Sequence, residues 1–185
     1  MQPSDRDEIR ELLKRTAVAL KQGDVPFALC GGYAAWVLGA PEPDHDADFL
    51  VREADAGRVA DALTGAGLEV VHPAEDWLVK VVAGGVFVDV LWRTCGVPVE
   101  DDLIARADVL PVLSVQMPVL AATDIVVTKL MALDEHYCDF ARLLPVARAL
   151  REQVDWDRVR AEVAGNDFAV VFLQLLGRLG VLPAR

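Results

Sequence analysis

The alternation of apolar and polar residues predicts helices and strands in turn over the first part of the chain. Apolar residues recur at helical spacing before Gly23, at Ile9, Leu12, Leu13, Ala17 and Leu20. A first helix is therefore predicted up to that glycine, with Ser4 as its N-cap. Helical patterns return in three shorter segments, 33–39, 53–67 and 99–108. Short apolar runs predict strands at 25–30, 47–51, 68–72, 77–83 and 86–92.

The pattern becomes mainly helical towards the C-terminus. Gly84 and Gly85 separate the last two apolar runs and predict a hairpin, and 109–117 is predicted to be extended. Helical spacing then continues over 122–137, 139–153, 155–165 and 167–180. Thr123, Asp139 and Asp155 are placed to cap these helices. We therefore predict an α+β fold, with a mixed sheet and flanking helices over residues 1–115 and a C-terminal helical region over 116–185.

Composition and charge narrow the class of partners. The 185 residues are 54% hydrophobic and carry a formal net charge of −11, without a run of Lys or Arg. This charge argues against nucleic acids and anionic membranes as partners. No apolar run approaches the ~20 residues that cross a bilayer, and the first residues lack the apolar core of a signal peptide, so we expect a cytoplasmic protein. Cys30, Cys95 and Cys138 are far apart in the sequence, which predicts reduced thiols rather than a disulfide or zinc site.

Three aspartates carry the candidate chemistry. Asp46 and Asp48 stand two residues apart at the start of a predicted strand, so their side chains should point to the same face. Adjacent carboxylates repel each other unless a cation lies between them, and Mg²⁺ prefers carboxylate oxygens. Asp89 lies between Val88 and Val90 in another apolar run, where a charged residue needs a partner or a function. The sequence therefore predicts a site for a divalent metal.

The order of these residues resembles the nucleotidyltransferase superfamily of DNA polymerase beta and the aminoglycoside and lincosamide nucleotidyltransferases. In that pattern, a strand leads to a glycine pair and a helix, then to Asp-x-Asp on the next strand and a third acid on a later one. The matching stretches here are GGYAAWVLG, DHDADFLV and VFVDVL. The stretch ATDIVVTKLMAL, with Asp139 after it, also resembles small bacterial members, including toxin-like ones. The resemblance covers residues 25–150.

The resemblance implies a minimal nucleotidyltransferase fold and an enzyme that uses a nucleoside triphosphate with Mg²⁺ or Mn²⁺. The three aspartates would hold the metal, and Asp89 could accept the proton of the attacking hydroxyl. Gly31 and Gly32 would bring backbone amides close to the phosphates, and Lys129 would contact the pyrophosphate. The implied reaction moves a nucleoside monophosphate, AMP from ATP, onto a hydroxyl of a small-molecule or protein acceptor.

The loop before the aspartates departs from the family pattern. Many small members carry Arg and Thr in the order R-x-T-x-D, where this chain has Glu42 and Asp44. Some polymerase-like members have a serine after the first glycine, whereas here Tyr33 follows the glycine pair. These differences favour an alternative function, a non-catalytic nucleotidyltransferase-like domain that binds a protein partner or belongs to a toxin–antitoxin pair.

Each candidate residue also has a simpler interpretation. The acidic loop could be a solvated turn, or a calcium loop of the D-x-D-x-D type, although Phe49 stands where such a loop needs glycine. The glycine pair could be a tight turn, Lys129 a surface lysine and His45 a solvated loop residue. The apolar segment 168–182 could belong to the core or form a homodimer interface.

Overall fold

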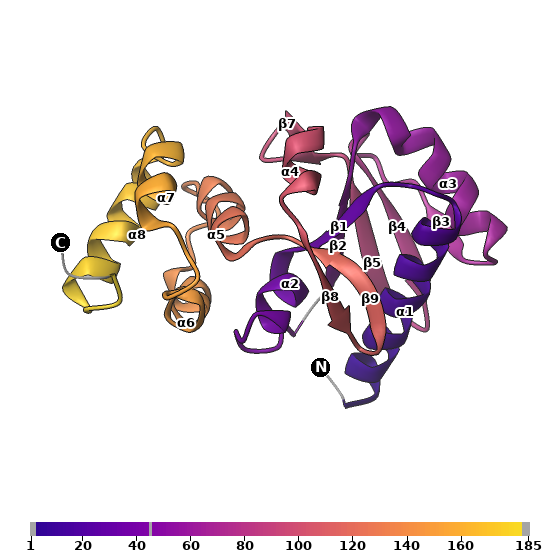
Figure 1. The fold of residues 1–185 in the computed structure, drawn as a ribbon, viewed down its shortest axis with the longest axis horizontal. Coiled ribbons are helices and arrows are strands. Elements are labelled where there is room, and N and C mark those ends of the chain that lie inside the picture. The colour runs from indigo at the N-terminus through magenta and orange to yellow at the C-terminus, as the bar shows by residue number, and fades with distance from the viewer. Residues whose placement is uncertain (1–2, 45, 183–185) are drawn as a thin grey trace. The chain divides into compact units, whose positions relative to one another are not determined.

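The computed structural model describes residues 3–44 and 46–182, so His45 lies outside the described residues. The chain divides into two compact units, residues 1–34 with 42–120 and residues 35–41 with 121–185. The first unit contains the sheet, and the second is helical (Figure 1). The domain boundary after residue 115 stays a prediction, because a compact unit need not fold independently.

A mixed seven-stranded sheet forms the first unit. Its strands are β1 (Phe27–Cys30), β2 (Ala47–Val51), β3 (Glu69–Val71), β4 (Leu78–Ala83), β5 (Val86–Leu91), β8 (Asp108–Val112) and β9 (Val115–Val119). They lie in the order β3-β4-β5-β2-β1-β9-β8. β2 pairs in parallel with β5, and β1 with β9, whereas the other neighbours are antiparallel. The predictions of a mixed sheet and of a hairpin at Gly84-Gly85 are confirmed.

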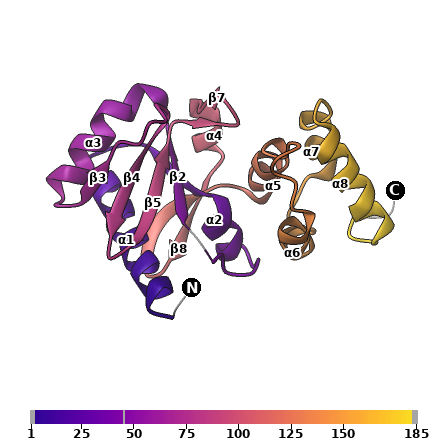
Figure 2. The ribbon, with the colours of Figure 1, turned by 180° about the vertical axis from the view of Figure 1, so that it is seen from behind.

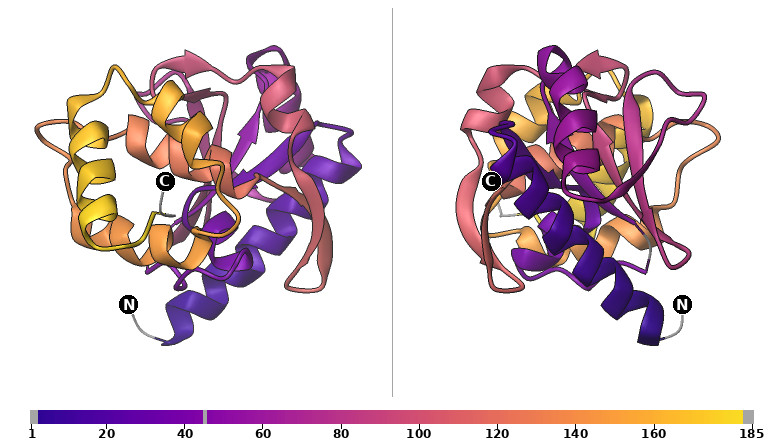
Figure 3. Two further views of the ribbon diagram at one scale, coloured as in Figure 1. Left: turned by 60° about the vertical axis from the view of Figure 1, so that its left-hand side comes forward. Right: turned by 90° about the vertical axis from the view of Figure 1, so that its right-hand side faces the viewer.

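Two helices cover one face of this sheet. α1 (Pro3–Gln22) packs across β4, β5 and β9, and α3 (Ala56–Gly65) packs beside α1 and against β3. In the right panel of Figure 3, the indigo α1 runs in front of the strands. Phe49 of β2 is fully buried, and its ring lies 5.5 Å from that of Phe27. Burial of such a side chain contributes about 1.5–3 kcal/mol, so the packing of this face helps to stabilise the first unit.

Short elements complete the first unit, and they differ in detail from the predicted pattern. They are the 3₁₀ helix η1 (Glu53–Asp55), the hairpin β6 (Arg93–Thr94) with β7 (Val97–Pro98), and the helix α4 (Asp101–Ala105). The extended segment predicted over 109–117 is the β8–β9 hairpin, which turns at Leu113 and Ser114. Both turn residues have positive φ, at 49° and 72°. This conformation is uncommon for leucine and serine, so the sequence does not predict it.

Asp55 is a buried acid that joins three parts of the first unit. It is 4% exposed and accepts hydrogen bonds from Arg52 Nε and Arg58 Nη1, at 2.5 and 3.0 Å. Arg52 also donates to Asp101 at the start of α4, and Arg58 to the carbonyl of Gly23 after α1. The hydrogen bond from Arg52 is the main reason that the pKa of Asp55 lies below its ordinary value, because it favours the charged carboxylate.

The second unit is built from four helices that follow one another in the chain. They are α5 (Ala122–Met131), α6 (Phe140–Leu150), α7 (Trp156–Glu162) and α8 (Asp167–Arg178), as labelled in Figure 2. α5 contacts each of the other three. A further short helix, α2 (Gly31–Val37), begins in the first unit and ends in the second. Among the described residues, no helix combines the length and apolar character needed to span a membrane.

Side-chain caps begin three of these helices. Asp139 and Asp155 cap α6 and α7 as predicted, and Asn166 caps α8. The prediction of Thr123 as the cap of α5 is wrong, because this helix starts from Ala121 without a side-chain cap. Thr123 lies inside the first turn, where its hydroxyl accepts a hydrogen bond from the backbone amide of Asp155 at 3.0 Å. The hydroxyl therefore ties α5 to the start of α7.

Candidate active site

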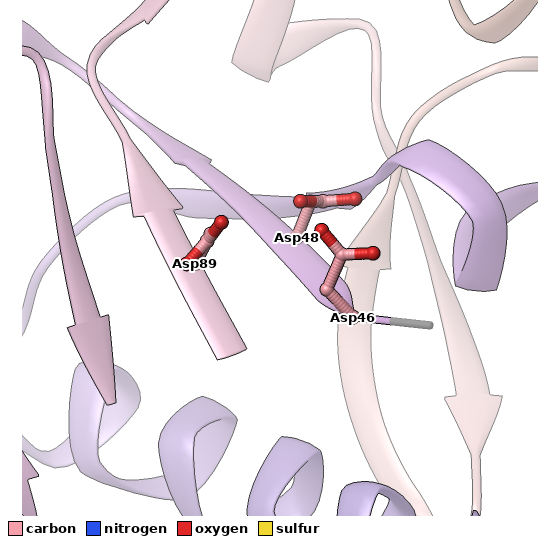
Figure 4. Close-up of side chains that lie close together, drawn as sticks. All are labelled: Asp46, Asp48 and Asp89. Atoms are coloured by element: carbon pink, nitrogen blue, oxygen red, sulfur yellow. The ribbon is translucent and has the colours of Figure 1, made fainter. Parts of the chain in front are cut away.

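Three aspartates from two parallel strands come together on the sheet face opposite α1 and α3. Asp46 directly precedes β2, Asp48 lies in β2 and Asp89 lies in β5 (Figure 4). The register places Asp48 opposite Asp89. One carboxylate oxygen from each of the three lies within 4.8 Å of the other two. A single cation can reach all three oxygens with small side-chain movements, because Mg²⁺ binds oxygen at about 2.0–2.1 Å.

Strand alternation places these carboxylates on the sheet face away from α1 and α3. The residues on either side of Asp48, Ala47 and Phe49, have no exposed surface. Val88 and Val90, on either side of Asp89, are equally buried. A slip of one residue in either strand would turn a carboxylate toward α1 and α3 and the apolar set away from them, so the hydrophobic pattern fixes the register. The same pattern therefore fixes the position of the acids.

The donor set fits a hard divalent cation. All three potential ligand atoms are carboxylate oxygens, which Mg²⁺ and Mn²⁺ prefer to softer nitrogen or sulfur ligands. The structure thus brings together the three aspartates that the sequence singled out. Their roles as metal ligands and catalytic groups stay predictions.

Asp89 is the most buried of the three, and it pairs with the basic residue Lys80. It is 7% exposed, and burial is the main cause that raises its pKa above the ordinary value. The charges of Asp46 and Glu75 raise the pKa further, whereas Lys80 acts in the opposite direction. The ammonium of Lys80 lies 2.8 Å from both carboxylate oxygens of Asp89. Lys80 therefore offsets part of the repulsion among the acids.

Sequence reasoning missed Lys80, although the signal was present. The hairpin at Gly84-Gly85 pairs Ala83 with Val86, and each further step back along β4 meets one step forward along β5. Three steps place Lys80 directly opposite Asp89. Opposite charges at facing positions of neighbouring strands attract each other, so the pair follows from the predicted hairpin.

The glycine pair packs directly against the acids. Gly31 has φ +65°, and a Cβ at this position would lie 2.1 Å from a carboxylate oxygen of Asp48. A Cβ at Gly32 would lie 2.8 Å from Cβ of Pro43 in the acidic loop. Both positions therefore need glycine for space, and Gly31 needs it also for its backbone conformation. Their contact with a nucleotide stays a prediction.

Arginines of α1 hold the acidic loop. Arg10 donates to both carboxylate oxygens of Glu42 at 2.8 Å, and Arg6 donates to Asp44 at 2.5 Å. The Glu42 side chain is 15% exposed, so this bidentate ion pair is partly shielded from water. Two residues further along, the loop delivers Asp46 to the site. The acids that replace Arg and Thr of the family pattern are therefore engaged by cations from another part of the chain.

Reversal of the Arg10 charge is expected to lower the free energy of unfolding by about 1–3 kcal/mol, because Glu42 would then face a like charge. The combined change Arg10→Glu with Glu42→Arg is expected to restore most of this loss. Urea unfolding of both variants checks the prediction, with Arg15→Glu on the exposed side of α1 as the control for net charge. A double reversal no more stable than Arg10→Glu would show that the pair does not hold the loop.

Lys129, the remaining predicted site residue, lies on α5 in the second unit. It is half-buried and lines a small apolar cavity with Val126, Leu130 and Leu143 among its neighbours. Such surroundings suit the aliphatic stem of a lysine whose ammonium reaches water. Its contact with pyrophosphate stays a prediction.

Comparison with known proteins relates the chain to the nucleotidyltransferases. The family model described as an uncharacterised nucleotidyltransferase matches residues 7–179. Among solved structures, ANT(2″)-Ia in complex with adenylyl-2″-tobramycin has a TM-score of 0.56 and 14% identity, over 89% of this chain and 97% of that chain. The lincosamide antibiotic adenylyltransferase LnuA, bound to lincomycin, has a TM-score of 0.51 and 11% identity, over 74% and 92%.

A nucleotidyltransferase-like protein from Paracoccidioides brasiliensis is similar over most of its length. It has a TM-score of 0.51 and 15% identity, over 91% of this chain and 93% of that chain. Among curated protein sequences, no relative matches significantly. At these identities, the solved structures establish the fold, which is that of the nucleotidyltransferases.

Proposed function

Because the chain belongs to this nucleotidyltransferase family, we propose that it transfers a nucleoside monophosphate, AMP from ATP, onto a hydroxyl of a small-molecule or protein acceptor, with Mg²⁺ or Mn²⁺ as cofactor. The observation that carries the proposal is the meeting of Asp46, Asp48 and Asp89 within 4.8 Å on adjacent strands. A protein that used this face only as a scaffold would gain nothing from three adjacent carboxylates, which repel one another.

Each acidic residue has a distinct part in the proposed reaction. Asp46 and Asp48 would hold the metal, and Asp89 would complete its ligand set. A bound divalent ion neutralises the triphosphate and the charge that develops as pyrophosphate leaves. Asp89 would also accept the proton of the attacking hydroxyl, because a carboxylate at the reacting centre can act as a general base. Gly31 leaves room for the Asp48 carboxylate, which a Cβ at this position would approach to 2.1 Å.

The charge of the chain favours a neutral or cationic acceptor. A net charge of −11 repels a polyanion such as RNA and attracts an amine-bearing molecule. Two of the solved structures of this fold hold an adenylylated aminoglycoside and a lincosamide, respectively. Tobramycin and lincomycin are therefore suitable first probes for the acceptor.

Thermal unfolding with ATP and Mn²⁺ tests the nucleotide and metal parts of the proposal together. A ligand present at a hundred times its dissociation constant stabilises the folded state by about 2.7 kcal/mol, which moves the midpoint upward by several degrees. ATP with EDTA should give little stabilisation. Transfer of label from [α-³²P]ATP to tobramycin or lincomycin then tests the acceptor. Absence of stabilisation by every nucleoside triphosphate, with metal present, would contradict the proposal.

A second candidate function is a non-catalytic module that binds a protein partner. The observation that favours it is that Arg6 pairs with Asp44 and Arg10 with Glu42. Both arginines near the loop are therefore already engaged by carboxylates. The transfer of label separates the two functions, because a non-catalytic module can bind ATP and Mn²⁺ but transfers no nucleotide.

A further inference from the structure

Lys80 is held in a defined place beside the candidate metal site. Its ammonium lies 2.8 Å from both carboxylate oxygens of Asp89, which stands opposite it in the β4–β5 hairpin. The same ammonium lies 4.3 Å from the centre of the Phe87 ring, on the same sheet face. The Lys80 side chain is 30% exposed, so the ammonium is held by a carboxylate and an aromatic ring in a partly solvated place.

The charges around Asp89 explain what this ammonium does. Asp46 and Asp48 place carboxylate oxygens within 4.8 Å of one on Asp89, and Glu75 acts on Asp89 through its charge. A carboxylate that is 7% exposed needs a compensating charge, because burial removes most of its hydration. Lys80 supplies a single positive charge at the distance and with the donor geometry of a strong ion pair.

The contact between Lys80 and Asp89 also opposes the binding of a metal ion at Asp89. A divalent cation bound to an Asp89 oxygen would have the Lys80 ammonium close by, because that ammonium touches both oxygens. The two cations repel each other strongly at such a separation in a partly buried site. Binding through Asp89 therefore requires Lys80 to move away or to remain at an unfavourable distance.

From this geometry we infer that Lys80 is a positioning residue that serves as an internal counter-ion for Asp89 and competes with the divalent metal for this carboxylate. The inference rests on the proposed function, because it takes the three aspartates as the metal site. Lys80 fixes the Asp89 side chain while the site holds no metal and lowers the affinity of the site for the cation. Asp46 and Asp48 would then make the first contacts with the ion.

Binding of Mn²⁺ alone, followed through the electron paramagnetic resonance signal of the free ion, tests this inference without any need for substrate. Lys80→Met removes the charge at nearly constant length and is expected to bind Mn²⁺ about tenfold or more tightly than the wild type. Lys80→Arg keeps the charge and is expected to stay within about threefold. Lys14→Met, on α1, changes the net charge equally at a lysine paired with Glu11 and should leave the affinity unchanged.

The tighter binding must depend on Asp89. In an Asp89→Asn background, Lys80→Met should no longer raise the affinity, because the carboxylate for which the two cations compete is gone. Lys80→Gln gives a second neutral variant should Lys80→Met fail to fold, as judged by circular dichroism. Without metal, the neutral variants should unfold at a lower temperature than the wild type, and saturating Mn²⁺ should remove the difference.

The outcomes separate this inference from the proposed function. Equal or weaker Mn²⁺ binding by both neutral variants would overturn the role of Lys80, even if the wild type transfers nucleotides. A gain in affinity that persists with Asp89→Asn would overturn it as well, because the competition would not involve Asp89. Failure of the wild type to bind Mn²⁺ would overturn both proposals. Tighter Mn²⁺ binding without any nucleotide transfer would support the role of Lys80 and count against the enzyme.

Discussion

Asp48→Asn is expected to lower metal-dependent nucleotide transfer on the order of a thousandfold and to leave the protein folded. Asp48 stands opposite Asp89 in the β2–β5 register and packs against Gly31. An amide of the same shape keeps that packing but has no charge with which to hold the cation. The stabilisation of the wild type by ATP with Mn²⁺ should therefore disappear, and circular dichroism should show an unchanged fold.

Asp44→Asn is the matched control for this prediction. Asp44 belongs to the same acidic loop, but its side chain is 64% exposed and pairs with Arg6. Surface ion pairs contribute little, about 0–1 kcal/mol, so this variant should keep its stabilisation by ATP and Mn²⁺ and its transfer rate within about threefold. Equal losses in the two variants would indicate a general effect of loop acidity. Full activity of Asp48→Asn would contradict the proposed metal site.

The sequence predicted the position of the acids because one physical pattern fixes both the fold and the site. Alternation within β2 places Phe49 in the core and Asp48 on the opposite face. Alternation within β5 does the same for Val88 and Asp89. The pairing of β2 with β5 cannot be read from either strand alone. The family resemblance implied only that the three acids hold one metal and therefore meet. Local pattern and resemblance together were therefore sufficient for the triad.

Contacts between distant segments were beyond the reach of local reasoning. Arg6 and Asp44 are 38 residues apart, and Arg10 and Glu42 are 32 apart. The helical pattern of α1 shows only that both arginines avoid its apolar stripe, and it gives no direction for their side chains. Such pairs depend on how α1 crosses the sheet. That crossing is a property of the packed core rather than of either segment.

The prediction that Thr123 caps α5 was wrong for a related reason. Thr123 belongs to a residue type that caps helices well, and local propensity therefore favoured it. In the structure Thr123 is 7% exposed, and its hydroxyl accepts a hydrogen bond from the backbone amide of Asp155. A tertiary hydrogen bond thus replaced the local one. By contrast, Asp139 and Asp155 stand at exposed helix starts, where the local rule held.

Asp55→Asn is expected to lower the free energy of unfolding by about 2–3 kcal/mol at pH 7. Breaking a fully buried ion pair costs about 3–5 kcal/mol, and the partial exposure of Arg52 and Arg58, at 30% and 49%, reduces that loss. The amide retains one oxygen that can accept a hydrogen bond, but it no longer attracts both guanidinium groups. Urea unfolding measures the loss, and Asp61→Asn on the exposed side of α3 is the matched control.

The effect of Asp55→Asn should depend on pH in a defined direction. The pKa of Asp55 in the folded protein is lowered, first by the hydrogen bond from Arg52, whereas an aspartate in the unfolded chain titrates near about 3.9. The carboxylate therefore contributes its full stabilisation above about pH 4–5 and loses it as the pH falls through the folded-state pKa. The difference between wild type and Asp55→Asn should be constant from pH 8 to about pH 5 and shrink below about pH 4. A difference that stays the same down to pH 3 would show that shape, rather than charge, accounts for the role of Asp55.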